Sequence, residues 1–111
     1  MAPAVKPISQ QSLAEAVELL TQAAPGAAII LFGSQARGDA SERSDLDLLV
    51  VEQQVANRQR EMVRLTDVLR PLRLPVDVLV VSRQTFEEWA DTPGTVIYQA
   101  AKEGKVLCAA A

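Results

Sequence analysis

The sequence predicts a small α/β domain (α+β in the broader sense) in which a mixed sheet is flanked by helices. Segments with helical periodicity alternate along the chain with short apolar segments typical of strands. The length of 111 residues is common for one domain, and 49% of the residues are hydrophobic, which is enough to fill one core. We find no repeat, low-complexity segment or linker. We therefore expect one domain over residues 1–111, with frayed ends at 1–8 and 109–111.

The first part of the chain predicts a helix and then a buried strand. Ser9 or Ser12 can cap the helix, and Pro25-Gly26 ends it. Its apolar face carries Leu13, Val17 and Leu20. The stretch 27–32 is continuously apolar and predicts a strand buried on both faces. A turn with one helical turn is expected over 33–38, and a polar loop over 39–44.

The second part predicts strands and helices in alternation. In order, we expect a strand over 45–51, a helix over 54–70, a strand over 76–81, a helix after Ser82 to Trp89 or Ala90, a helix over 95–103 and a short edge strand over 105–108. The helix over 54–70 would bury Val55, Met62, Leu65 and Leu69. Gly104 is expected to stop the last helix as its C′ residue.

Composition excludes several classes of protein. The sequence has no histidine, which removes Ser-His-Asp hydrolysis, His-Cys proteolysis and the H-E-x-x-H zinc sites. The lone Cys108 excludes a disulfide framework and a multi-cysteine zinc site. A net charge of −3 gives no reason to expect direct nucleic-acid binding. No apolar run is long enough to span a membrane and none resembles a signal peptide, so we expect a cytoplasmic protein without membrane contact.

Acidic residues occupy strand positions where the pattern calls for apolar ones. Asp45 and Asp47 are two residues apart, so their side chains would leave the same face of a strand. Asp77 stands between two valines near the start of another strand. If these strands are neighbours, three carboxylates converge, and two charges ~4 Å apart repel by ~4 kcal/mol at an effective dielectric of ~20. Protonation, an arginine or a hard cation such as Mg²⁺ can compensate them, and two such ions can clamp the oxygens of a phosphoryl transfer.

A second candidate feature follows the first buried strand. Gly33 has no Cβ, so a phosphate can approach the backbone closely there, and Ser34 adds a hydroxyl. Gly33 and Gly38 also have the outer spacing of a P-loop. Asp39 stands where that motif needs lysine, however, and its carboxylate would repel phosphates. The P-loop interpretation therefore fails.

These features together resemble a known family. Gly33-Ser34, ten residues and then D-L-D at 45–47 resemble the G-S-x10-D-x-D signature of the DNA polymerase β-like nucleotidyltransferase superfamily. The strings L-F-G-S-Q-A-R-G at 31–38 and S-D-L-D at 44–47 are similar to its minimal nucleotidyltransferase (MNT) branch. V-D-V at 76–78 is similar to the third-carboxylate strand, and G-K-V-L at 104–107 to the usual ending, with Cys108 in place of a frequent aromatic. The resemblance covers nearly the whole chain.

The resemblance implies a role for each matching residue. Gly33 and Ser34 would hold the phosphates of the nucleotide, and Asp45 and Asp47 would bind the Mg²⁺ ions. Asp77 would complete the metal site beside the acceptor hydroxyl, where it can bind metal or accept the proton. The implied reaction moves a nucleoside monophosphate from an NTP to a hydroxyl and releases pyrophosphate. ATP is the donor by the habit of the family.

Taken one at a time, some of these residues can also be explained by purely structural roles. Asp45 can merely flank a strand, and Ser34 can act as a helix N-cap. Arg37 can contact nucleotide phosphates, or it can be a solvated loop residue or form a salt bridge with Asp39 or Glu42.

The resemblance also implies a partner. MNT proteins are commonly paired with helical HEPN proteins, and in several pairs the MNT protein is the antitoxin that adenylylates a tyrosine of the HEPN toxin. The sequence has no further domain to hold an acceptor, so we expect a hetero-oligomer or self-association to complete that side. Two alternatives stay open: an antitoxin that acts by binding alone with a vestigial site, and a nucleotidyltransferase for small molecules.

Overall fold

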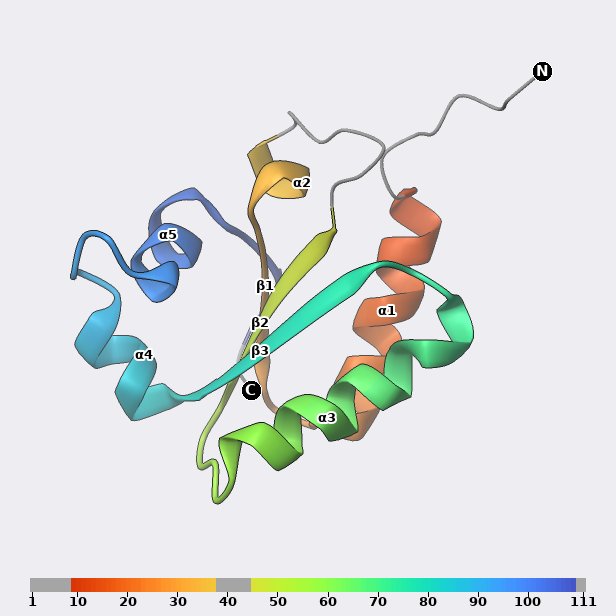
Figure 1. The fold of residues 1–111 in the computed structure, drawn as a ribbon, viewed down its shortest axis with the longest axis horizontal. Helices are drawn as coiled ribbons and strands as arrows, with labels where there is room; N and C mark the ends of the chain where they lie inside the picture. The colour runs from red at the N-terminus through yellow and green to blue at the C-terminus, as the bar shows by residue number, and fades with distance from the viewer. Residues whose placement is uncertain (1–8, 38–44, 110–111) are drawn as a thin grey trace.

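The computed structural model describes residues 9–37 and 45–109, which form a mixed sheet between two layers of helices (Figure 1). In chain order the elements are α1 (Gln10–Ala23), β1 (Ala28–Phe32), α2 (Ser34–Arg37), β2 (Leu46–Glu52), α3 (Arg58–Leu69), the 3-10 turn η1 (Arg70–Leu72), β3 (Val76–Ser82), α4 (Arg83–Trp89), α5 (Val96–Glu103) and β4 (Lys105–Cys108). The predicted loop over 39–44 and the expected fraying of 1–8 and 110–111 lie outside the described residues.

The sheet has the strand order β3-β2-β1-β4. β1 is antiparallel to both β2 and β4, whereas β2 and β3 are parallel. This arrangement confirms the predicted mixed sheet and the predicted edge position of the strand over 105–108. It also places the C-terminal end of β1 beside the N-terminal ends of β2 and β3.

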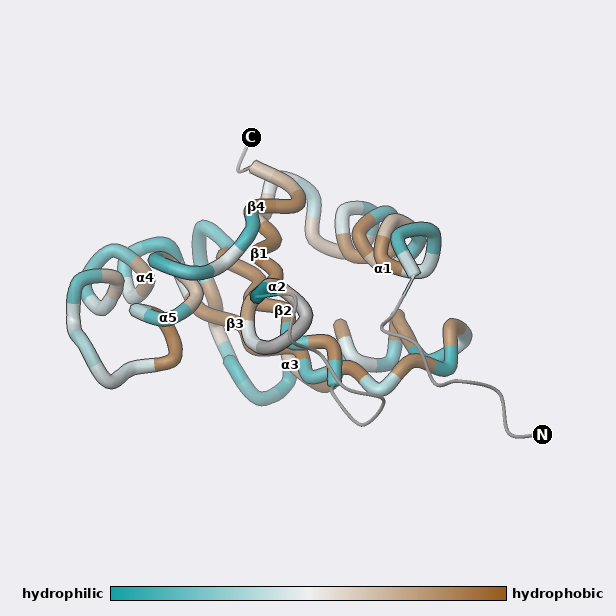
Figure 2. Tube along the Cα trace, turned by 90° about the horizontal axis from the view of Figure 1, so that it is seen from above, coloured by the Kyte–Doolittle hydropathy of each residue, from teal (hydrophilic) through white to brown (hydrophobic). Residues whose placement is uncertain are grey.

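Helices cover both faces of the sheet, which is why the central strands are almost continuously apolar (Figure 2). On one face lie α1 and α3, and on the other α4 and α5. Alternate residues of β2 point to opposite faces. Leu46, Leu48 and Val50 pack in the cluster with α1 and α3, whereas Leu49 and Val51 pack in the cluster that includes Ala100 of α5. Each such side chain stabilises the fold by about 1.5–3 kcal/mol when fully buried.

Several predicted helix starts are confirmed by their caps. The backbone N–H of Ser12 donates to Oγ of Ser9 at 3.1 Å, and that of Thr85 donates to Oγ of Ser82 at 3.2 Å. Such caps satisfy N–H groups that have no partner within the helix, and each contributes about 1 kcal/mol. α1 and α4 therefore begin where the sequence places them.

The helix predicted over 54–70 begins four residues later, at Arg58. The side-chain oxygen of Asn57 accepts the N–H of Arg60 at 3.0 Å and fixes this start. Val55 therefore precedes the helix, although it still packs against the cluster of α1 and α3. The apolar spacing predicted too early a start, because Val55 has helical spacing but is partly buried from a loop.

Gly104 ends α5 but not as the left-handed residue that a C′ glycine usually is. Its φ and ψ are −75° and 161°, an extended conformation. Glycine is required here by space: an added Cβ would overlap the carbonyl oxygen of Ala100 and lie 2.6 Å from Cγ2 of Ile30. The predicted helix end is correct, whereas its physical reason is close packing on β1.

No helix in the described part of the chain combines the length and the apolar character that a membrane span requires.

Candidate functional site

The ends of three strands bring the predicted site residues to one edge of the sheet. Phe32, the last residue of β1, pairs with Asp47, and Asp47 pairs with Asp77 in the parallel ladder. Paired residues of neighbouring strands point to the same face, so the carboxylates of Asp47 and Asp77 lie side by side. By the alternation of β2 this is the face that α4 and α5 cover. Asp45 immediately precedes β2 and is exposed.

Gly33 lies directly against the carboxylate of Asp47. Its φ of +76° is a conformation that favours glycine, and an added Cβ would overlap Oδ2 of Asp47 and lie 3.2 Å from its Cγ. The carbonyl oxygen of Gly33 accepts the N–H groups of Ala36 and Arg37, each at 3.1 Å, which closes the single turn of α2. Glycine is therefore required by the backbone and by its neighbour together.

Ser34 begins α2, as expected from the predicted helical turn, but its side chain lies outside what the structure describes. Gly38 and Asp39, the two residues on which the rejected P-loop interpretation depended, also lie outside the described residues.

The negative charges of Asp45 and Asp77 act on Asp47 and change its pKa. The pKa of Asp47 is raised above its ordinary value of 3.8, first by burial and then by the negative charges of Asp77 and Asp45. The positive charge of Arg37 opposes this rise. Among the described residues that act on Asp47, two further carboxylates are opposed by one guanidinium.

Arg37 connects the site with α5. Its Nη1 atom lies 3.7 Å from Oε2 of Glu103, the last residue of α5. The alternative partners considered for Arg37, Asp39 and Glu42, lie outside the described residues. The observed pair with Glu103 was not predicted, because the two residues are far apart in the sequence.

The donor chemistry at this edge suits Mg²⁺, which binds carboxylate and phosphate oxygens and retains several waters. Within residues 9–37 and 45–109, no three acidic, histidine or cysteine side chains are grouped closely enough to hold a metal ion by themselves. The paired Asp47 and Asp77 are two carboxylates whose oxygen chemistry fits Mg²⁺, and Asp45 directly precedes β2.

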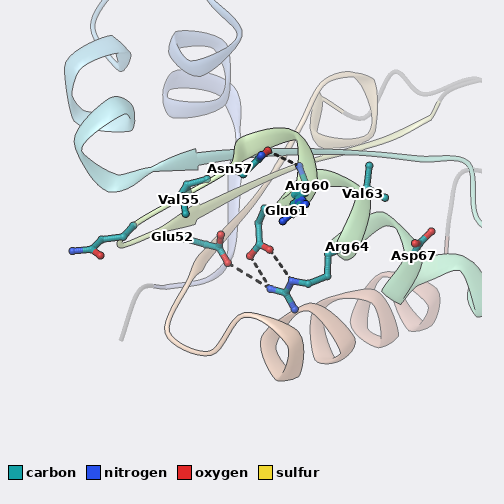
Figure 3. A pocket seen from close by; sticks show the side chains of 10 residues that line it. Glu52, Val55, Asn57, Arg60, Glu61, Val63, Arg64 and Asp67 are labelled. Carbon is teal, nitrogen blue, oxygen red and sulfur yellow. Dashed lines mark hydrogen bonds and ion pairs between the residues drawn. The ribbon is translucent and has the colours of Figure 1, made fainter.

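A second acidic cluster, which the sequence analysis missed, lies at the other end of β2 (Figure 3). Arg64 binds both carboxylate oxygens of Glu61 at 2.7 Å, lies 3.9 Å from Oε1 of Glu52 and donates to the carbonyl oxygen of Ala23 at 2.9 Å. Glu52 is 14% exposed in its side chain. The spacing of Glu61 and Arg64 signals a helical ion pair, but the sequence does not show that Glu52 joins it.

The pKa values of this cluster move in opposite directions. Burial, a hydrogen bond to Glu61 and its negative charge raise the pKa of Glu52 from 4.5 to about 7. The hydrogen bonds from Arg64 and from Glu52 hold the pKa of Glu61 well below its usual range. Glu52 therefore takes up a proton more readily than an ordinary glutamate, whereas Glu61 stays ionised beside Arg64. A cavity of about 670 Å³ opens beside these side chains.

Comparison with known proteins identifies the family. A family model described as "Nucleotidyltransferase domain" matches residues 13–107. A solved complex of an MNT antitoxin with the tri-AMPylated HEPN toxin of Shewanella oneidensis is similar at 19% identity and a TM-score of 0.61, covering 92% of this chain and 73% of the other. A toxin–antitoxin structure with AMP-PNP is similar at 20% identity and a TM-score of 0.64, covering 92% and 74%.

A candidate nucleotidyltransferase from Sulfolobus solfataricus is similar at 23% identity and a TM-score of 0.61, covering 86% of this chain and 76% of the other. No curated protein matches the sequence. The structural likenesses establish the polymerase β-like fold, and the family model covers most of the chain. On this evidence the chain belongs to the nucleotidyltransferase domain family.

Proposed function

We propose that the protein is a Mg²⁺-dependent nucleotidyltransferase that moves AMP from ATP to a hydroxyl of a partner HEPN toxin, and that it acts as the antitoxin. The observation that carries this proposal is the pairing of Asp47 with Asp77 against Gly33. Such a cluster is costly unless a cation compensates it.

The aspartates would hold the Mg²⁺ ions. Asp47 is the central ligand, because it lies between Gly33 and Asp77, and Asp45 approaches from the start of β2. Bound Mg²⁺ would supply charge neutralisation for the phosphates and lower the pKa of the acceptor hydroxyl. The exposed Asp77 lies on the outer strand β3, the side where a protein acceptor can enter.

The nucleotide would bind at the turn after β1. Gly33 has no side chain to obstruct a phosphate, and Ser34 and Arg37 follow it in α2. In the reaction the acceptor oxygen forms a bond to the α-phosphorus, the bond to the pyrophosphate oxygen breaks, and pyrophosphate leaves. The hydroxyl proton passes to the carboxylate of Asp77 or to water.

The nature of the acceptor is inferred from relatives. A solved relative is an MNT antitoxin with a tri-AMPylated HEPN toxin, and another contains AMP-PNP, an ATP analogue. We propose a tyrosine hydroxyl as the acceptor. Neutralisation by binding alone and transfer to a small molecule remain the competing functions.

Intact mass spectrometry tests the proposal. The chain is incubated with a candidate HEPN protein, ATP and Mg²⁺, and the HEPN protein is weighed. We expect additions of AMP-sized mass that disappear with EDTA and with Asp47→Asn, while the two proteins still form a complex. The variant Asp91→Asn changes an exposed acid that follows α4 and pairs with Lys102, and as the control it should keep the reaction.

The competing functions give different results in the same assay. If the unaltered chain forms no adduct on the HEPN protein and the Asp47→Asn variant still neutralises that toxin, the result would support neutralisation by binding alone. Transfer to an aminoglycoside-like hydroxyl compound, with none to the HEPN protein, would support the small-molecule function. No adduct with any NTP would contradict nucleotidyl transfer to this partner.

A further inference from the structure

A groove lies at the outer edge of the sheet, where β3 leads into α4 (Figure 1). Its walls come from the end of β3 (Val81), the start of α3 (Arg58), the end of α4 (Trp89) and α5 (Ile97). Its volume is about 410 Å³. Ligand pockets typically measure about 300–1,000 Å³, so the groove can hold a large apolar side chain of another molecule.

Trp89 presents a large apolar surface at this groove. The residue is 45% exposed, although aromatic residues of this size are mostly buried in folded proteins. Its indole N–H has no hydrogen-bond partner among the described residues. Tryptophan is enriched at the centres of protein interfaces, because one ring removes a large apolar area from water. Trp89 therefore fits a contact that a second protein completes.

Arg58 supplies a fixed positive charge at the same groove. Its Nε–H group donates to the carbonyl oxygen of Val80 at 2.9 Å, which holds the guanidinium against the edge strand β3. Within residues 9–37 and 45–109, no acidic side chain pairs with Arg58. Among the described residues that line the groove, Arg58 alone carries a charge. An apolar side chain next to a carboxylate would complement this combination.

The groove and the proposed acceptor side of the catalytic site lie on the same strand. Asp77 and Val81 are four residues apart on β3, so their side chains leave the same face about 13 Å apart, at about 3.3 Å per residue. Asp77 is exposed, and β3 is the outer strand of the sheet. The same distance equals about nine residues of a helix. One helix of an acceptor protein can therefore bring a hydroxyl to Asp77 and an anchor to the groove.

We propose that the groove at Trp89 and Arg58 is the docking site for the acceptor protein, which inserts an apolar side chain beside Trp89 and places a carboxylate beside Arg58. The inference rests on the proposed function and deepens it, because it assigns the partner a surface outside the aspartate site. Docking here raises the effective concentration of the acceptor hydroxyl at Asp77 and leaves nucleotide binding unchanged.

Binding of the HEPN protein used in the mass assay tests the docking site. Its affinity for the chain is measured by calorimetry, and both KM values and kcat are measured in the transfer assay. We expect Trp89→Ala to weaken binding, and to raise KM for the HEPN protein, by at least about tenfold, because a tryptophan anchor is lost. KM for ATP and kcat at saturating HEPN protein should stay within about twofold. Trp89→Phe, which keeps a large ring, should recover most of the affinity.

Salt dependence gives Arg58 a readout of its own. Arg58→Gln should weaken binding about three- to tenfold, and Arg58→Glu should weaken it further, because the reversed charge repels the carboxylate of the acceptor. The affinity of the unaltered chain should fall as salt is added, since salt screens the charge pair. This fall should be smaller in Arg58→Gln.

Two matched variants serve as controls, and both should leave the affinity unchanged. Val106→Ala truncates an apolar residue that is 64% exposed on β4, at the opposite edge of the sheet. Arg70→Gln removes an exposed charge at the other end of α3. Sedimentation of the chain alone tests a different occupant. A dimer that Trp89→Ala dissociates would assign the groove to a second copy of the chain and would overturn the proposal.

The outcomes separate the docking site from the proposed function. Transfer with an unchanged KM for the HEPN protein in Trp89→Ala would overturn the docking site alone. A parallel loss of ATP binding in Trp89→Ala would show a structural role and would overturn it as well. A complex that forms without transfer, and that weakens in Trp89→Ala, would overturn the proposed reaction and leave the docking site standing. Absence of any complex with the unaltered chain would overturn both.

Discussion

Two groups of carboxylates lie at opposite ends of strand β2, and the fold treats them differently. At the C-terminal end, burial and Glu61 raise the pKa of Glu52 to about 7, and Arg64 makes two hydrogen bonds of 2.7 Å to Glu61. At the N-terminal end, burial and the charges of Asp77 and Asp45 raise the pKa of Asp47, and the charge of Arg37 opposes that rise.

The difference teaches how to recognise a functional acidic cluster in a structure. In the glutamate cluster, Arg64 of the same cluster balances the acidic side chains. The cluster can therefore be explained by its effect on stability alone. Among the residues that the structure describes, the aspartate cluster combines three carboxylates with the guanidinium of Arg37, and Asp47 lies against the buried Gly33. Carboxylates that outnumber the positive charges around them are a pattern expected of a cation and phosphate site.

The largest contrast is expected when one carboxylate of each cluster becomes an amide. Asp47→Asn should reduce nucleotidyl transfer by at least about a hundredfold, since a metal ligand is lost. Its free energy of unfolding without Mg²⁺ should stay equal or increase, because the amide removes the repulsion from Asp77. Glu52→Gln should keep transfer within about twofold. For both variants, the mass assay measures the transfer and urea unfolding measures the free energy of unfolding.

A marked loss of transfer in Glu52→Gln would break this comparison. A strong loss of stability in metal-free Asp47→Asn would break it equally, because it would show that the fold depends on that carboxylate.

A smaller contrast is expected between two glycines with positive φ. Gly33 has a φ of +76° and contacts Asp47, whereas Gly94 has a φ of +88° and nothing within 4 Å of an added Cβ. Gly94→Ala should lower the free energy of unfolding by about 1 kcal/mol through backbone strain alone. Gly33→Ala should lower it by about 2 kcal/mol or more and abolish transfer. Equal losses of stability, with transfer retained in both, would show that the carboxylate of Asp47 moves aside freely.

The smallest effect concerns pH. A folded-state pKa of about 7 for Glu52, against 4.5 in the unfolded chain, means that the folded protein binds the proton more tightly. This contribution to stability is complete below about pH 4.5 and is lost as the pH rises through 7. We expect the free energy of unfolding to fall by on the order of 1–3 kcal/mol between pH 5 and pH 8. Denaturant unfolding at a series of pH values measures the fall.

Two controls assign this fall to a cluster. Glu52→Gln should remove most of the fall, because the amide imitates the protonated acid. Asp47 has a pKa raised in the same direction, so Asp47→Asn should remove only part of the fall. Glu61, with its lowered pKa, stabilises the fold above its ordinary value of 4.5 and loses that contribution as the pH falls below it. If the fall in the free energy of unfolding keeps its full size in Glu52→Gln, the raised pKa of Glu52 would be contradicted.

Much of the fold could be predicted from local signals. The caps at Ser9 and Ser82 and the continuously apolar central strand depend on neighbours in the sequence, and they were predicted correctly. The start of α3 was predicted too early, because Val55 has helical spacing but is partly buried from a loop. The reason for Gly104 was also missed, since it lies in contacts with Ile30 and Leu31.

The candidate site divides in the same way. The motif indicated Gly33, Asp45, Asp47 and Asp77, because the polymerase β-like pattern is written in residue types and spacing. Glu103 and the cluster of Glu52 with Arg64 have no such pattern. Each pair of partners comes from elements that the chain order does not join, so only the packing of the helices reveals them.

The sequence by itself determined which side chains are available for chemistry: it has carboxylates but no histidine, and a glycine follows a buried strand. It also determined where helices begin, because the capping residues mark their starts. Only the tertiary structure decided which charges meet. Strand register placed Asp47 against Asp77 and Gly33, and the packing of α5 placed Glu103 beside Arg37. The reason is physical: propensity and capping act over a few residues, whereas electrostatic interactions depend on distances that are set when the sheet and its helices close around the core.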